Sequence, residues 1–463
     1  MNPSRRNMLL SSLFGAGCVG LRALATGIPA SILLNPRRAL AGPCATGTTP
    51  QFVIMNISDG GDPINANAPG SYIAGVGNAP ALLLPTATTT LGGKPYTAAQ
   101  GWSTLPAAST SVWHVMTDNE IHPHLPEVLS LNGGVVQPDM FPSWLSRQLQ
   151  PCLGTLQGQP ISLGAGSPVE ALSYQGLPLA PIAPQALQAT LTNNSTDANL
   201  PKVSLLTSKN LLALRDDTLA QLNNVYLQGA SKAQVNFVNS MVLSEQQVRA
   251  IPEALLANLG SITGNGPSDQ VTAAVALIQM KIAPVITIHI PFGGDNHVDT
   301  GLKTESAQTL SGLQTLNSLI TLLGTTQMPG TNTALSDLVS VISLNVFGRT
   351  LSAATSANGR GHNENHQVSF AIGKPFKGGV YGGLVSLGSA PTDDFGALPI
   401  ESATGAGSSS GDVKPVDTLQ SFAMTVAVGV GVPATTVTSA ISSDSTYTSS
   451  GLDTAKVISA ALA

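Results

Sequence analysis

The stretch that decides the fold is VITIHIPFGGDNH, residues 285–297. Its first six residues are mostly β-branched, which predicts a strand in a buried sheet. The glycines that follow allow a sharp turn, so Asp295 and His297 come directly after the strand, where open α/β sheets usually bind their ligands. These two residues are the first candidate pair, whereas His289, inside the strand, is predicted to be a hydrogen-bonded core residue.

Similar patterns on either side of this stretch predict the fold class. Buried strands are expected at 52–57, 112–116, 339–344 and 368–372, and helices at 268–282, 305–323 and 417–430. Because apolar runs alternate with helices, we expect a three-layer α/β sandwich with a mostly parallel central sheet. Residues 66–111 lack periodicity and predict an irregular segment, and a loop-rich and helical insertion is expected at about 153–283.

Residues 1–41 have the pattern of a twin-arginine signal peptide. Arg5 and Arg6 precede an apolar stretch, and an A-x-A site ends at Ala41. The alternative is an uncleaved anchor, but Arg22 and Pro29 interrupt that span. We therefore expect a periplasmic or secreted protein with no stable membrane span after cleavage, whose residues 42–463 form the α/β domain.

Composition and cysteine content limit the function classes. Five arginines and no acidic residue precede Gly42, so the remaining chain carries 15 basic and 25 acidic groups. No basic patch for nucleic acid is expected. Cys44 and Cys152 remain after removal of the leader, and they are either a disulfide, which an oxidising compartment favours, or two separate thiols.

Five short motifs occur along the chain in a fixed order. They are DPIN at 62–65, IHPHL at 121–125, DNH at 295–297, NVFGRT at 345–350 and GRGH at 359–362. Together they resemble the bacterial family called domain of unknown function 1501, which uses the twin-arginine route and is grouped with the alkaline phosphatase and sulfatase superfamily. The resemblance covers most of the chain after the leader and implies an alkaline-phosphatase-like fold.

The resemblance also implies a metal site. In the superfamily, the matching acids and histidines bind a pair of divalent metals, which makes Asp62, Asp295, His297 and His362 the expected ligands of Zn, Mn, Mg or Ca. Further candidates for ligands or supporting residues are Asp59, His122, Asn345 and His366. From the residues alone, a turn that uses the Asp59 or Asp62 carboxylate is the better interpretation of the segment after the first strand.

This chain also departs from the family pattern. Asn345 stands where the family has a glutamate, and Gly361 stands where it has an aspartate, so two anionic oxygen ligands are missing. For catalysis, the sequence offers Ser143 as a weak candidate nucleophile and Arg349 as a clamp for an anion.

Two functions therefore compete. One is an exported alkaline-phosphatase-like protein with a degenerate metal site and a role in binding an envelope component. The other is a metal-dependent hydrolase of small anionic phosphate or sulfate esters.

Overall fold

The computed structural model describes most of the chain between residues 44 and 463. The described residues are 44–45, 47–122, 128–131, 139–164, 172–192, 217–218, 221, 224, 227–228, 235, 258–352, 359–388, 395–441 and 454–463. The predicted signal peptide lies outside them. Within these ranges, every helix is too short or too polar to span a lipid bilayer.

A seven-stranded sheet forms the centre of the molecule, in the order β13-β4-β12-β9-β1-β8-β5. Its strands are β1 (Phe52–Ser58), β4 (Thr110–Val115), β5 (Ile161–Ser162), β8 (Val285–Ile288), β9 (Val339–Asn345), β12 (Gln367–Ile372) and β13 (Gly379–Tyr381). β1 pairs in parallel with both β8 and β9, and β12 runs antiparallel to its neighbours β9 and β4. The mostly parallel sheet predicted from the sequence is confirmed.

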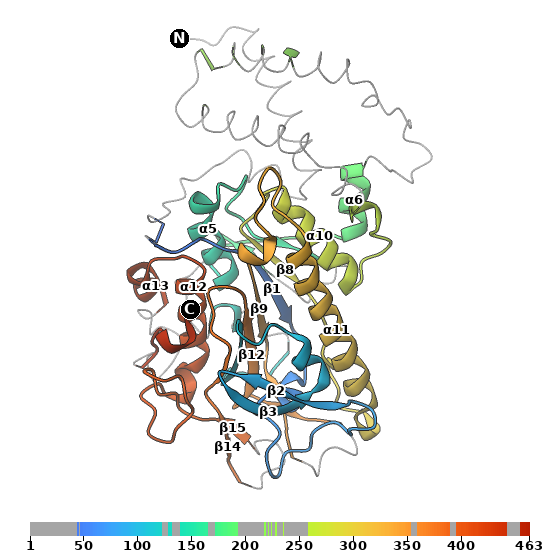
Figure 1. Cartoon of the computed structure of the whole chain (residues 1–463), viewed down its shortest axis with the longest axis vertical. Coiled ribbons are helices and arrows are strands. Elements are labelled where there is room, and N and C mark those ends of the chain that lie inside the picture. Colours follow the sequence, from blue (N-terminus) through green and yellow to red (C-terminus); the bar gives the residue numbers. More distant parts are fainter. Residues whose placement is uncertain are drawn as a thin grey trace.

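Helices cover both faces of this sheet (Figure 1). They are α10 (Pro267–Gln279) and α11 (Lys303–Thr325) on one face, and α5 (Phe141–Leu153), α12 (Thr418–Gly429) and α13 (Ala434–Ile441) on the other. Alternation along β1 separates the two cores, because Ile54 packs with the first set and Met55 with the second. The predicted class, a mixed α/β fold with helices on both faces of a sheet, is confirmed.

Residues 66–111 are more regular than their composition suggests. They contain a hairpin of β2 (Thr86–Leu91) and β3 (Lys94–Ala99), followed by the 3-10 helix η1 (Gln100–Thr104). The turn uses Gly92 and Gly93, both with positive φ. Trp102 is buried and packs edge-on against Phe370, so the expectation of an irregular segment is wrong over this part.

The range 153–283 contributes to the main sheet as well as to peripheral elements. It contains β5 and α10, and also β6 (Ser173–Tyr174), β7 (Leu177–Pro178) and α6 (Pro184–Thr192). Most of residues 193–257, which belong to the expected loop-rich and helical insertion, lie outside the described residues.

The remaining elements are short. They are α3 (Ile64–Asn67), η3 (Thr300–Leu302), η4 (Leu335–Asp337), β10 (Gly348–Arg349), β11 (His362–Asn363), β14 (Leu384–Ser386), β15 (Phe395–Ala397), η6 (Pro415–Asp417) and η7 (Ser459–Ala461).

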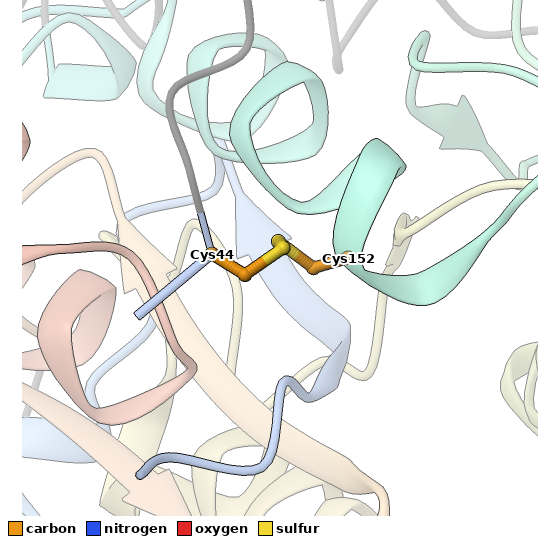
Figure 2. The surroundings of a disulfide bond; sticks show 2 residues. All are labelled: Cys44 and Cys152. Carbon is orange, nitrogen blue, oxygen red and sulfur yellow. A yellow bond between two sulfur atoms is a disulfide. The ribbon is translucent and has the colours of Figure 1, made fainter. Parts of the chain in front are cut away.

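A disulfide joins Cys44 to Cys152 (Figure 2), which decides between the two readings of the cysteines. The Cα atoms are 5.7 Å apart, within the usual range for a disulfide. The bond ties the segment before β1 to the last turn of α5, across a sequence separation of 108 residues.

Candidate metal centre

Three loops meet at one edge of the sheet because β1, β8 and β9 are parallel neighbours. Residues 59–62 follow β1, residues 292–297 follow β8, and residues 346–349 follow β9. A fourth segment joins them where β11 pairs with β10, which places His362 opposite Arg349. Residues far apart in the sequence thus form one site where strand ends of α/β sheets commonly hold ligands.

His122, Asp295 and His362 form the centre of this site. Each offers one ligand atom, and these three atoms lie within 4.8 Å of one another. Nε2 of His297 lies 2.8 Å from Nε2 of His362 and 3.4 Å from Oδ1 of Asp295. Of the four expected ligands, the structure therefore brings Asp295, His297 and His362 together, and His122 lies with them.

The two histidines of the three-residue group each direct one nitrogen to a backbone carbonyl. Nδ1 of His122 lies 2.5 Å from the carbonyl oxygen of Asp59, and Nδ1 of His362 bonds to that of Glu120. A carbonyl oxygen only accepts, so both Nδ1 atoms carry the hydrogen and Nε2 is left unprotonated in the neutral ring. This arrangement is typical of metal-binding histidines.

Nε2 of His122 is free for a ligand, and Nε2 of His362 becomes so when its hydrogen bond with His297 is released. Among the described residues, the buried Nε2 of His122 has no hydrogen-bond partner. Burial lowers the pKa of His362 to about 4, and the charge of Arg349 acts in the same direction, so this ring is neutral near pH 7. His297 then supplies the hydrogen of the 2.8 Å contact with His362.

Phe347 holds the two rings in place from the β9 side. Its ring centroid lies 4.2 Å from that of His362 and 4.7 Å from that of His122. Gly61 leaves the space for this ring, since a Cβ there would come within 1.9 Å of Phe347. The Phe-Gly-Arg segment thus contributes packing as well as a charge.

Arg349 fixes the acid of the site. Its guanidinium is buried and donates to the carbonyls of Gly60 and Gly61 and to Oδ1 of Asp295, the last at 2.9 Å. Burial alone raises the pKa of Asp295, but the hydrogen bond and charge of Arg349 outweigh it and lower that pKa below its usual value. Asp295 is therefore an anionic candidate ligand that remains half-exposed.

Asp62 and Asn345 lie beneath the site and support its loops. Oδ1 of Asp62 accepts the backbone N–H of Gly294 at 2.7 Å, and Asn345 donates to the backbone oxygen of Asp62. Both side chains are buried. The Asp62 carboxylate is not part of the three-residue group, and Asp59 contributes its backbone oxygen to His122.

The remaining candidates lie away from the three-residue group. His366 is fully buried and contacts His114 at 2.9 Å. His289, which is predicted to be hydrogen-bonded and not a ligand, bonds to the carbonyl of Ile57. Ser143 lies on α5, is fully buried and donates its hydroxyl to the carbonyl of Ser173. In this arrangement Ser143 is not accessible as a nucleophile.

The sequence left His122 as either a further ligand or a supporting residue, and the structure places it in the three-residue group. The IHPHL motif points to this residue, but its orientation depends on the backbone of Asp59, distant in the sequence.

Comparison with family models, with curated proteins and with solved structures gives no match. The chemistry is therefore inferred from the donor set. Two imidazoles and one carboxylate suit a borderline divalent ion such as Zn²⁺, with a further coordination position left for water or a ligand. This donor set has fewer oxygen ligands than Mg²⁺ or Ca²⁺ sites use.

Proposed function

We propose that this protein is exported, binds one divalent transition-metal ion through His122, Asp295 and His362, and uses the site to bind an anionic component of the cell envelope. The observation that carries the proposal is the orientation of the two imidazoles. Each is held by a backbone carbonyl through Nδ1, and the ligand atoms of all three residues lie within 4.8 Å. Such orientation ahead of binding favours a metal-ligand role over two independent surface histidines.

A single metal fits this site better than the pair found in the superfamily that the chain resembles. Asp62 accepts a backbone N–H, and Asn345 and Gly361 stand where carboxylates are expected. Each missing anionic oxygen weakens the attraction for a second hard or borderline cation. The bound ion would supply Lewis acidity and positive charge, and His122, Asp295 and His362 would hold it.

Metal analysis tests this proposal directly. Protein purified from the periplasm without chelators should contain about one Zn, Mn, Co, Ni or Cu per chain, as measured by mass spectrometry of the metals. Calorimetry on stripped protein should show tighter binding of Zn²⁺ than of Mg²⁺ or Ca²⁺, because imidazole donors prefer borderline ions. Substoichiometric metal together with no Zn²⁺ binding to the stripped protein would overturn the proposal.

The hydrolase remains a second candidate, favoured by the position of His297. This residue is half-exposed, borders Asp295 and His362, and could exchange a proton with a bound ester. Phosphate and sulfate monoesters, assayed with each metal added, test it. Turnover that disappears in His297→Ala would support catalysis, and no turnover with any metal would leave binding as the function.

A double substitution tests descent from a two-metal site. Asn345→Glu with Gly361→Asp restores the two carboxylates that the family pattern contains. A Cβ at Gly361 would meet Thr350 at 3.3 Å, so this side chain needs only a small adjustment. A second metal per chain in the variant would support descent, and unchanged stoichiometry in a folded variant would contradict it.

Export is tested separately. Replacement of Arg5 and Arg6 by lysine should leave an uncleaved precursor in the cytoplasm if the twin-arginine pattern is used. Unchanged periplasmic accumulation would point to another route.

A further inference from the structure

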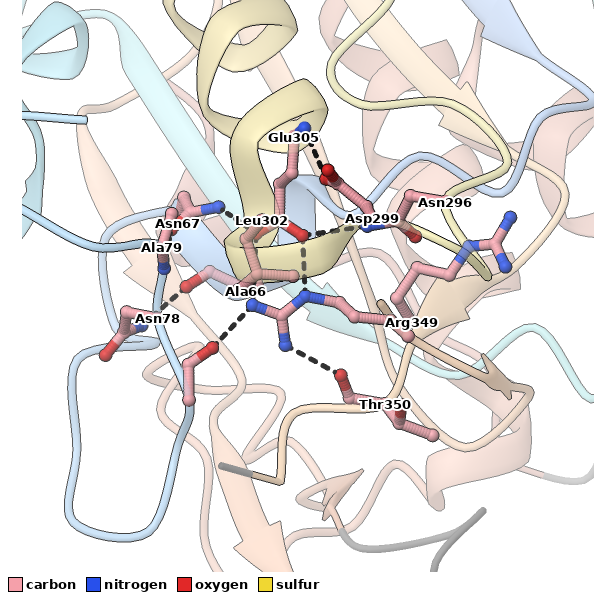
Figure 3. A network of polar contacts seen from close by, with 12 residues as sticks. Ala66, Asn67, Asn78, Ala79, Asn296, Asp299, Leu302, Glu305, Arg349 and Thr350 are labelled. Carbon is pink, nitrogen blue, oxygen red and sulfur yellow. Dashed lines mark hydrogen bonds and ion pairs between the residues drawn. The ribbon is translucent and has the colours of Figure 1, made fainter. Parts of the chain in front are cut away.

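Asn296 lies between Asp295 and His297 but is directed away from the solvent, into a buried polar network (Figure 3). Its side-chain Nδ2 donates to Oε2 of Glu305 at 2.9 Å. Its backbone oxygen accepts the N–H of Arg360 at 3.1 Å. One residue of the loop after β8 is thus held at two points.

The network also fixes the segment that carries His362. Arg360 donates Nε to Oε2 of Glu305 at 2.7 Å and NH2 to Oε1 at 3.0 Å, and both side chains are fully buried. Arg360 also donates to the carbonyl of Thr350 at 2.8 Å, while the backbone N–H of Gly361 donates to the Thr350 hydroxyl. A paired charge of this kind holds a defined geometry, because loss of one partner leaves the other charge buried and uncompensated.

The loop after β8 and the segment with His362 approach so closely that glycine is required at their contact. Gly359 has φ +91°, and a Cβ there would lie 2.1 Å from the backbone oxygen of Asn296. Glu305 lies in the first turn of α11, which packs on the sheet, so the network is anchored to a rigid element. Buried contacts beneath the site therefore set the distance between two segments, the loop with Asp295 and His297 and the segment with His362.

We propose that Asn296 is a positioning residue, which fixes the loop with Asp295 and His297 against the segment with His362 through Glu305 and Arg360, without touching the bound ion. The metal-binding part of this inference rests on the proposed function, whereas the arrangement of His297 and His362 does not. Residues that orient metal ligands typically change affinity 10–100-fold when they are replaced.

Asn67 provides a matched control. It is also buried and donates its Nδ2 to the same carboxylate, to Oε1 of Glu305 at 2.8 Å, but no candidate ligand is adjacent to it. It further accepts the N–H of Ala79, so Asn67→Ala removes at least as many hydrogen bonds as Asn296→Ala. If Asn296 had only a structural role, Asn296→Ala and Asn67→Ala would therefore have similar effects on Zn²⁺ affinity and on the histidines of the site.

The experiment compares Asn296→Ala, Asn296→Ser and Asn67→Ala in the mature protein. Zn²⁺ affinity, measured by competition with a chelator, should fall about 10–100-fold in both Asn296 variants and less than about threefold in Asn67→Ala. The ring-nitrogen shifts of His297 and His362, recorded by NMR on metal-free protein, should change in the Asn296 variants alone. The serine variant keeps the test valid if the alanine variant does not fold.

Each outcome separates the two proposals. If wild-type protein binds no Zn²⁺ but the histidine shifts still change only in the Asn296 variants, the metal proposal fails and the positioning role stands. Unchanged shifts in the Asn296 variants, or equal changes in Asn67→Ala, would overturn the positioning role even if wild-type protein binds Zn²⁺ tightly.

Discussion

Two pairs of histidines in this protein make nearly equal contacts but lie in opposite surroundings. His114 and His366 approach to 2.9 Å in the core, and His297 and His362 approach to 2.8 Å at the strand ends. In the core pair, the second nitrogen of His114 donates to the carbonyl of Pro69, and that of His366 faces Asn65. All four ring nitrogens of the core pair thus have protein partners.

The second pair differs in access and charge. It lies beside a half-exposed carboxylate, Asp295, and close to His122, whose buried Nε2 has no partner among the described residues. Contact between imidazoles therefore does not identify a metal site. A candidate metal site is indicated when a free ring nitrogen, a second nitrogen held by a carbonyl and an accessible acid occur together.

The largest expected effect is on Zn²⁺ affinity, which should depend on His362 of the second pair but not on His366 of the core pair. His362→Ala removes a ligand and should lower Zn²⁺ affinity by more than about 100-fold, since loss of an orienting residue alone costs 10–100-fold. His366→Gln leaves the three-residue group intact and should keep wild-type stoichiometry. Calorimetry on metal-free protein measures both, and equal losses in the two variants would contradict the distinction between the pairs.

The second prediction concerns acid stability and the core pair. Burial lowers the pKa of His114 from its usual 6.5 to about 4, only partly opposed by the hydrogen bond to Pro69. Between these pH values the unfolded chain binds a proton that the folded protein does not, so stability should fall as the pH drops from about 6.5 to 4. The loss from His114 is of the order of 3 kcal/mol, at about 1.4 kcal/mol per pKa unit.

Urea unfolding at several pH values measures this effect. The free energy of unfolding should fall less steeply in His114→Gln than in wild-type protein. Some slope should remain, because the pKa values of His366 and His362 are also lowered by burial. Identical slopes in both proteins would contradict the assignment to the core pair.

The third prediction tests the residue that connects the two regions. Asn65 is buried, its Oδ1 accepts the N–H of Arg349 at 3.1 Å, and its Nδ2 donates to the Arg349 carbonyl at 2.8 Å and faces His366. Asn65→Ala leaves these buried groups unpaired and should cost about 1–3 kcal/mol of stability. Zn²⁺ affinity should change less than about 10-fold, because no ligand is removed. A greater loss of affinity than in His362→Ala would show that the core pair and the site are one unit.

The fold could be predicted where side-chain pattern alone determines the structure. The β-branched runs of β1, β8 and β9 and the apolar face of α11 identify the central layers without long-range information. The sequence does not predict the β2–β3 hairpin because its strands contain alanine and proline and little apolar alternation. The packing of Trp102, which follows the hairpin, depends on Phe370, a residue distant in the sequence. The family resemblance and the export route stay predictions.

The site could be predicted only in part. The polar residues after β8 indicated Asp295 and His297, because ligands usually bind at the strand ends of α/β sheets, whereas His362 was indicated only by the family resemblance. The orientation of His122 depends on the backbone carbonyl of Asp59, and that of His362 on the backbone carbonyl of Glu120. Neither carbonyl is encoded in a side-chain pattern. The sequence offered both Asp59 and Asp62 as acids of the site, but the turn after β1 directs the Asp62 carboxylate to the N–H of Gly294 and presents only the backbone oxygen of Asp59 to His122.

The smallest expected effect concerns Asp62. Its carboxylate accepts the N–H of Gly294, the residue before Asp295, so it supports the loop and does not reach the three-residue group. Asp62→Asn keeps an oxygen that can accept this hydrogen bond, and Zn²⁺ affinity should change less than about threefold. Asp295→Asn removes an anionic ligand of similar size and should lower affinity by more than about 100-fold, beyond the 10–100-fold cost of losing an orienting group. Titration of Asp62→Asn and Asp295→Asn with Zn²⁺ under the same conditions measures this difference in affinity. Comparable losses would mean that Asp62 turns toward the ion when metal binds, and that the two-metal arrangement implied by the family resemblance is retained.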